Sequence, residues 1–114
     1  MKRMMLVLII ALPLVAFQGP YKAGDGVSQP TLISKVEPNY TQEARDAKIQ
    51  GVVQLSSVVD ENGLAQDIKI LRSLDKGLDE NAILAVRQWR FKPGQKEGKP
   101  VAVQVTIEVS FKLL

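Results

Sequence analysis

The end of the chain, residues 101–113, alternates strictly between two kinds of side chain. Every odd position from Val101 to Leu113 is apolar, and every even position between them is polar or small. A side-chain period of two is typical of a β-strand with one buried face and one solvent-exposed face. At about 3.3 Å per residue this stretch would extend for roughly 40 Å, about twice the length of a usual strand. We therefore predict a strand that supports a sheet along part of its length and offers free backbone along another.

The composition excludes several functional classes. The chain has 114 residues, enough for one domain, and it contains no Cys and no His. Disulfide scaffolds, thiol nucleophiles, Cys/His zinc sites and imidazole catalysis are therefore excluded. Two of the basic residues, Lys2 and Arg3, lie at the very start, and the remaining 13 basic residues face 12 acidic ones. No basic block is left to bind phosphates, so we do not expect nucleic-acid binding. We also expect no metal and no cofactor.

Catalysis is not expected either. The one pair of adjacent carboxylates in a promising loop, Asp60 and Glu61, belongs to an Asp-Glu-Asn-Gly sequence that is typical of a hairpin turn. The serines at positions 56, 57 and 73 have no identifiable base beside them. We predict that the chain is not an enzyme.

Three segments follow from the distribution of apolar and turn-forming residues. Residues 1–19 combine a basic start with an apolar run at 5–17, which predicts a signal peptide or a short N-terminal anchor. Either alternative places the remainder outside the cytoplasm, in the periplasm. Residues 20–34 are rich in Gly and Pro and read as a flexible linker, and residues 35–114 form the folded domain.

Within the folded domain the expected order is α–β–β–α–β. Thr41 is a plausible N-cap of a short first helix, and strands at 52–59 and 64–72 flank the hairpin turn, with Ile68 and Ile70 directed inward. A longer helix is expected to begin with Asp79 as its N-cap. Its buried stripe consists of Leu78, Ala82, Ala85, Val86 and Trp89.

These connections predict the sheet. A tight hairpin makes the first two strands antiparallel, and a helical crossover makes the second and third parallel. The fold class is therefore α+β, a two-layer sandwich whose three-stranded mixed sheet has the order 2-1-3, with two helices on one face. The final strand then lies at an edge.

The ordered set of short motifs resembles the C-terminal domain of the TonB family of energy transducers. The resemblance covers residues 36–114. It rests on Pro38-x-Tyr40, Glu43-Ala44-Arg45, Gly51-x-Val53, Asp60-x-x-Gly63, Ser73, Gly77-Leu-Asp79, Ala82, Ala85, Trp89-Arg-Phe-Lys-Pro93, Gly98-x-Pro100-Val101 and Phe111.

The resemblance implies a periplasmic module that binds the TonB box, an extended N-terminal segment of outer-membrane transporters, as a strand beside its last β-strand. Family members are anchored in the inner membrane and coupled to an ExbB–ExbD motor, so a motor of that type is an implied partner if the N-terminus is an anchor. The chain departs from the family in having Thr41 where Pro is frequent and in lacking a long Pro-rich spacer. Since residues 18–37 span only about 65–70 Å when fully extended, we favour a stand-alone periplasmic TonB-type domain.

The expected binding site is the edge of the final strand. An edge strand presents unpaired N–H and C=O groups to which another chain can add. Two alternatives remain open, namely a homodimer paired through the same edge and a strand with no partner. Flanking contacts are assigned to Tyr40 and Arg90, while Trp89 and Phe91 are expected in the core. The predicted partner-binding residues are Val103, Gln104, Val105, Thr106, Ile107, Glu108, Val109 and Ser110.

Overall fold

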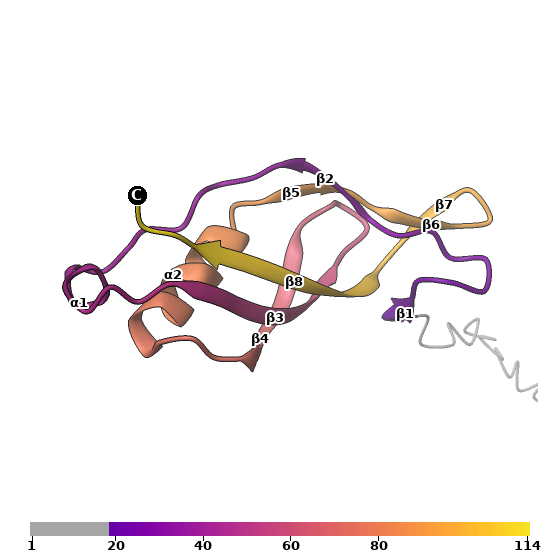
Figure 1. Ribbon diagram of the computed structural model, residues 1–114. Helices are drawn as coiled ribbons and strands as arrows, with labels where there is room; N and C mark the ends of the chain where they lie inside the picture. Colours follow the sequence, from indigo (N-terminus) through magenta and orange to yellow (C-terminus); the bar gives the residue numbers. More distant parts are fainter. Residues whose placement is uncertain (1–18) are drawn as a thin grey trace, which may run out of the picture.

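The main sheet of the computed structural model, which describes residues 19–114, is built around strand β3 (Gly51–Val59). This strand pairs antiparallel with β4 (Ala65–Arg72) on one side and with β8 (Val103–Phe111) on the other. On the far side of β8, the two-residue strand β1 (Tyr21–Lys22) adds in parallel, which gives the order β1-β8-β3-β4 (Figure 1). The three expected strands have the predicted order. The sheet also contains a fourth strand, β1, which was not predicted from the sequence. The predicted leader, residues 1–19, lies outside the described residues except for Gly19.

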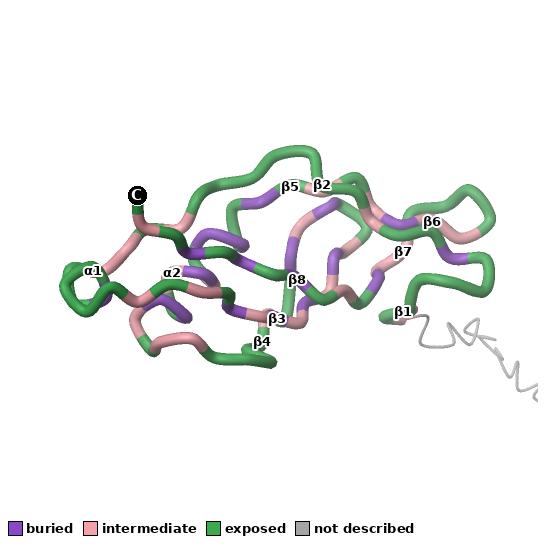
Figure 2. Tube along the Cα trace, in the orientation of Figure 1, coloured by how far each residue is buried: buried purple, intermediate pink, exposed green. Residues whose placement is uncertain are grey.

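Most apolar side chains of β3 and β8 face a common core, although Val52 at the start of β3 is 41% exposed. In β8 the side chains alternate between buried and exposed along most of the strand, as the colours of Figure 2 show. Phe111 and Leu55 are among the largest fully buried side chains. The period of two that predicts the strand therefore also assigns its buried face correctly. The regular strand is shorter than residues 101–113 at both ends, since it ends at Phe111 and a separate strand, β7 (Lys99–Val101), precedes it.

The two helices lie at different places on the sheet. Helix α2 (Lys76–Val86) crosses one face, and Leu78, Ala82, Ala85 and Val86 are buried there as predicted. Helix α1 (Gln42–Asp46) lies near the end of the sheet rather than across its face, although its Ala44 reaches the core (Figure 1). Neither helix of residues 19–114 is long and apolar enough to cross a membrane.

The predicted N-cap is confirmed for α1 and wrong for α2. The Thr41 hydroxyl caps α1 by accepting a hydrogen bond from the Ala44 N–H at 3.1 Å, as predicted. The N-cap of α2 is Asp75, whose carboxylate accepts from the Leu78 N–H at 3.1 Å, so the assignment to Asp79 was wrong. Asp79 is buried in the first turn instead. There its carboxylate accepts hydrogen bonds from the Ser73 hydroxyl and from the Leu74 and Asp75 N–H groups.

Two further sheets of two strands each complete the fold. Strand β2 (Thr31–Ser34) pairs antiparallel with β5 (Arg90–Lys92), and β6 (Gly94–Lys96) pairs with β7. Both β1 and β2 come from residues 20–34, for which the sequence predicts a flexible linker. This segment therefore runs along the domain and is paired to it at both of these strands.

Strand β4 is less regular than predicted. Ile68 is half-buried, but Ile70 is 42% exposed, so the inward placement of Ile70 was wrong. The cause is local, because the pairing of β3 with β4 shifts register twice and Asp67 has a φ of 49°. Irregularities of this kind re-aim the side chains that follow them.

Candidate functional site: a groove along the edge of β8

The free edge of β8 begins where β1 ends. The Tyr21 N–H donates a hydrogen bond to the Ala102 carbonyl oxygen at 2.9 Å, and the pairing with β1 continues only to Gln104. Successive residues of a strand direct their backbone groups to opposite sides. Since Ala102 faces β1, the N–H and C=O groups of Thr106, Glu108 and Ser110 face the same edge. No strand of residues 19–114 pairs with them there.

The opposite edge of the sheet is much less suited to accept a strand. Strand β4 carries the two register shifts, the positive φ of Asp67 and an exposed Asp67–Lys69 ion pair at 3.7 Å. Bulges and charges are devices that prevent edge-to-edge pairing. By contrast, β8 pairs with β3 without a register shift from Val103 to Phe111. The regular and unblocked edge is therefore that of β8.

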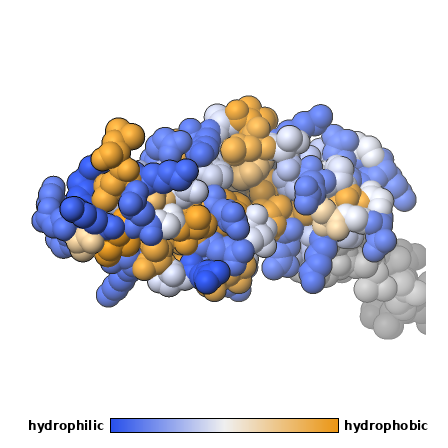
Figure 3. Space-filling view, in the orientation of Figure 1, coloured by the Kyte–Doolittle hydropathy of each residue, from blue (hydrophilic) through white to orange (hydrophobic). Residues whose placement is uncertain are grey.

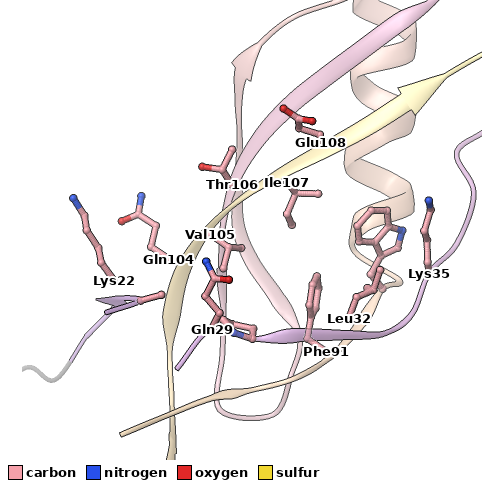
Figure 4. A pocket seen from close by; sticks show the side chains of 13 residues that line it. Lys22, Gln29, Leu32, Lys35, Phe91, Gln104, Val105, Thr106, Ile107 and Glu108 are labelled. Carbon is pink, nitrogen blue, oxygen red and sulfur yellow. The ribbon is translucent and has the colours of Figure 1, made fainter. Parts of the chain in front are cut away.

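A groove of about 810 Å³ runs beside this edge (Figure 4). One side is β8, and the other is formed by the segment that contains β2 and by the residues at the end of α2. In Figure 4, Val105 and Ile107 lie on one side of the space, and Leu32 and Phe91 on the other. Trp89 also lines the groove. The lining consists of Lys22, Ala23, Gln29, Pro30, Leu32, Lys35, Trp89, Phe91, Gln104, Val105, Thr106, Ile107 and Glu108.

Trp89 and Phe91 are both core residues and groove residues. Trp89 is only 5% exposed, and its indole N–H donates to the Val36 carbonyl oxygen at 2.8 Å. Phe91 packs against the core with its ring centroid 6.3 Å from that of Trp89. Their predicted placement in the core is confirmed. Because their positions are fixed by core packing, they form a preorganised wall.

The predicted site residues are distributed unevenly around the groove. Val103 and Gln104 are already paired with β1, whereas residues 105–108 border the open part. Val109 is buried, and Ser110 lies nearer a second hollow of about 290 Å³, which Tyr40 also lines. The Tyr40 hydroxyl donates to the Ile49 carbonyl oxygen, and its ring meets that of Phe111 edge-on at 5.5 Å.

Arg90, the other expected flanking residue, is not among the groove residues. Its guanidinium donates to the Trp89 carbonyl oxygen at 2.9 Å, and its backbone belongs to β5. The structure therefore brings the β8 residues together with Trp89 and Phe91, but not with Arg90.

Sequence reasoning missed the far wall of the groove. Apart from Lys35, the residues that precede the first helix and line the groove come from the segment expected to be a linker: Lys22, Ala23, Gln29, Pro30 and Leu32. The run Thr31-Leu-Ile directly after Pro30 was the available signal, since two β-branched residues flank a leucine there. A four-residue strand with every side chain exposed gives no alternation to detect.

The carboxylates of the hairpin are used structurally. Asp60 accepts hydrogen bonds from the Asn62 and Leu64 N–H groups and from the Gln66 side-chain amide. Burial acts to raise the pKa of the Asp60 carboxyl, but these hydrogen bonds outweigh it and hold the pKa below its ordinary value. Residues 19–114 contain no cluster of three acidic side chains that could hold a metal ion.

Comparison with known proteins agrees with this architecture. The family described as Gram-negative bacterial TonB protein C-terminal matches residues 36–113. Protein TonB of Vibrio cholerae is 35% identical over 103 residues, covering 89% of this chain and 42% of that protein. Protein TonB of Escherichia coli K12 is 27% identical over 84 residues, covering 73% of this chain and 35% of that protein.

A solved structure extends the likeness to three dimensions. The solution NMR structure of the Pseudomonas aeruginosa TonB CTD superimposes with a TM-score of 0.62 at 30% identity, covering 75% of this chain and 88% of that one. The chain spans only about two fifths of the length of its Vibrio cholerae relative. Since the matched residues include the core, the hairpin and all of β8, the chain belongs to the TonB C-terminal domain family.

Proposed function

We propose that this domain binds an extended N-terminal segment of an outer-membrane transporter, the TonB box, by adding it as a strand to the free edge of β8. The observation that carries the proposal is the unpaired stretch from Thr106 to Ser110 beside an open groove of about 810 Å³. An exposed edge supplies affinity through backbone hydrogen bonds, and the neighbouring side chains supply specificity. Pairing of β1 with the start of the same edge supports this, because it places a strand of the chain itself in such a position.

Family membership supports the wider role. Proteins of the TonB family are non-enzymatic energy transducers anchored in the inner membrane, with this domain in the periplasm, in agreement with the prediction that the chain is not an enzyme. We infer that the domain serves energy-coupled transport from the periplasm. An ExbB–ExbD-like motor is its proposed partner if the N-terminus is an anchor.

The test is a titration of the full chain, in mild detergent, with a panel of TonB-box peptides. We expect saturable binding that is lost when the order of residues in the peptide is scrambled. No binding at millimolar peptide, with the protein folded and monomeric, would contradict the proposal. NMR shift changes should map to residues 105–110 and not to β4, which serves as the internal control.

The alternative is an assembly module that forms a homodimer through β8. The same unpaired edge motivates it, because two copies can pair where a peptide would add. Light scattering across a concentration series distinguishes the two proposals. A stable dimer that does not dissociate on addition of peptide would favour the assembly role.

A further inference from the structure

Part of the far wall of the groove comes from residues outside the family domain. The family match begins at residue 36, whereas Gln29, Pro30, Leu32 and Lys35 all precede it. Figure 3 shows an apolar patch over the β2–β5 side of the molecule. Strand β2 carries two exposed apolar side chains, Leu32 at 44% and Ile33 at 69%, and of these Leu32 lines the groove. The wall therefore presents apolar surface beside the β8 edge.

This wall is held in place at both ends. At one end, the Ser28 N–H donates to the Gln95 carbonyl oxygen at 3.0 Å, and the Gln95 N–H donates to the Ser28 hydroxyl at 2.9 Å. At the other, the Val36 carbonyl accepts the hydrogen bond from the Trp89 indole. Between them, β2 pairs with β5. The segment is thus a fixed part of the groove.

The pleat of β8 determines what an added strand would present to this wall. Residues in register with Val105 and Ile107 would direct their side chains to the same side as these two, toward Leu32 and Phe91 (Figure 4). Residues in register with Thr106 and Glu108 would point to the open face. Every second side chain of the ligand therefore enters apolar surroundings, which favour a large apolar group.

We propose that residues 29–35 and β8 clasp the ligand from two sides, and that Leu32 selects a large apolar side chain at alternate positions of an extended segment. This proposal rests on the proposed function, because the occupant is the same added strand. It adds a specificity-determining residue that lies outside the family domain. The groove continues the line of β1, which already occupies the start of the edge.

The experiment compares Leu32→Ala with the matched control Ile33→Ala in the full chain. Both residues lie on β2, but Ile33 is 69% exposed and does not line the groove. The probe is the tightest-binding TonB-box peptide of the panel, together with its single-alanine variants. We expect Leu32→Ala to weaken binding about tenfold, in line with the loss of a buried aliphatic contact, and Ile33→Ala to change it less than twofold.

The peptide variants provide the second readout. Replacement by alanine should weaken binding to the wild-type chain at alternate positions only, and at least one of these positions should lose its sensitivity in the Leu32→Ala chain. Circular dichroism confirms that both variants are folded. If the peptide binds but Leu32→Ala behaves like Ile33→Ala, the proposed role of Leu32 is wrong, while strand addition to β8 is still supported. If no peptide of the panel binds the wild-type chain, both proposals are contradicted, namely strand addition to β8 and the contact of the ligand with Leu32.

Discussion

The Phe91 N–H donates a hydrogen bond to the Gly63 carbonyl oxygen at 2.9 Å, which joins the tip of the β3–β4 hairpin to the strand that lines the groove. A Cβ at Gly63 would overlap the Phe91 carbonyl oxygen, and Gly63 has a φ of 79°. Glycine is therefore needed at the hairpin both for its backbone conformation and for the close approach of β5.

Gly63→Ala should accordingly destabilise the fold strongly. We expect a loss of about 2–4 kcal/mol in the free energy of unfolding, since the positive φ and the overlap act together. The control is Gly26→Ala, where φ is 85° but nothing lies within 4 Å of the added Cβ. It should cost only about 1 kcal/mol. Urea denaturation measures both, and equal losses would contradict the role of the Phe91 contact.

The two acidic residues at the start of α2 should differ in importance. Asp75 is a half-buried N-cap, and its replacement by alanine should cost about 1 kcal/mol. Asp79 is 4% exposed and satisfies three donors, so Asp79→Ala should cost about 2–4 kcal/mol because those donors lose their acceptor. Thermal and urea unfolding of the two variants test the order. A larger loss for Asp75→Ala would show that the cap is the dominant interaction.

Stability should depend on the ionisation of Asp60. Its pKa is lowered in the folded state from 3.8, so its contribution is complete above that value and is lost as the pH falls through the lowered pKa. Asp60→Asn should therefore be less stable than the wild type by about 1 kcal/mol at pH 7. The difference should shrink as the pH falls below 3.8 and the carboxylate becomes protonated. The exposed neighbour Glu61 provides the control, and Glu61→Gln should stay within about 0.5 kcal/mol of the wild type. A difference for Asp60→Asn that is the same at pH 2 and pH 7 would contradict this account.

Proline at Thr106 should separate binding from folding. The Thr106 N–H faces the free edge, so Thr106→Pro removes a donor that the fold itself does not use, and proline is tolerated on such edges. We expect TonB-box peptides to bind more than tenfold more weakly, with a stability loss below about 2 kcal/mol. Ile107→Pro should cost about 3 kcal/mol or more, because the Ile107 N–H faces β3. Unchanged peptide binding by a folded Thr106→Pro chain would argue against addition at this edge.

Much of the fold could be predicted because the strong periodicities of the chain have direct structural causes. The alternation in β8, the buried stripe of α2 and the turn at residues 60–63 each reflect burial or backbone geometry that local sequence encodes. The Asp79 cap was wrong because Asp75 and Asp79 both lie near the start of the helix. Sequence alone does not show that Asp75 accepts from the Leu78 N–H within the helix, whereas Asp79 accepts from N–H groups of residues 74 and 75 before it.

Only one side of the groove could be predicted from the sequence. The β8 side follows from its pattern, whereas the far wall depends on short exposed strands that pair with distant residues, such as Ser28 with Gln95. Four exposed residues in β2 bury too little apolar surface to leave a periodic signal. Strand β2 is placed by its pairing with β5, and the residues before it by the hydrogen bonds between Ser28 and Gln95 of β6.

Amide hydrogen exchange along β8, with and without a bound TonB-box peptide, tests the central claim most directly. In the free protein, the N–H groups of Thr106, Glu108 and Ser110 should exchange fast, while those of Val105, Ile107 and Val109 should be protected by β3. Bound peptide should slow exchange at Thr106 and Glu108. Protection of these two amides in the free monomer, or fast exchange at both when peptide is bound, would contradict strand addition at this edge.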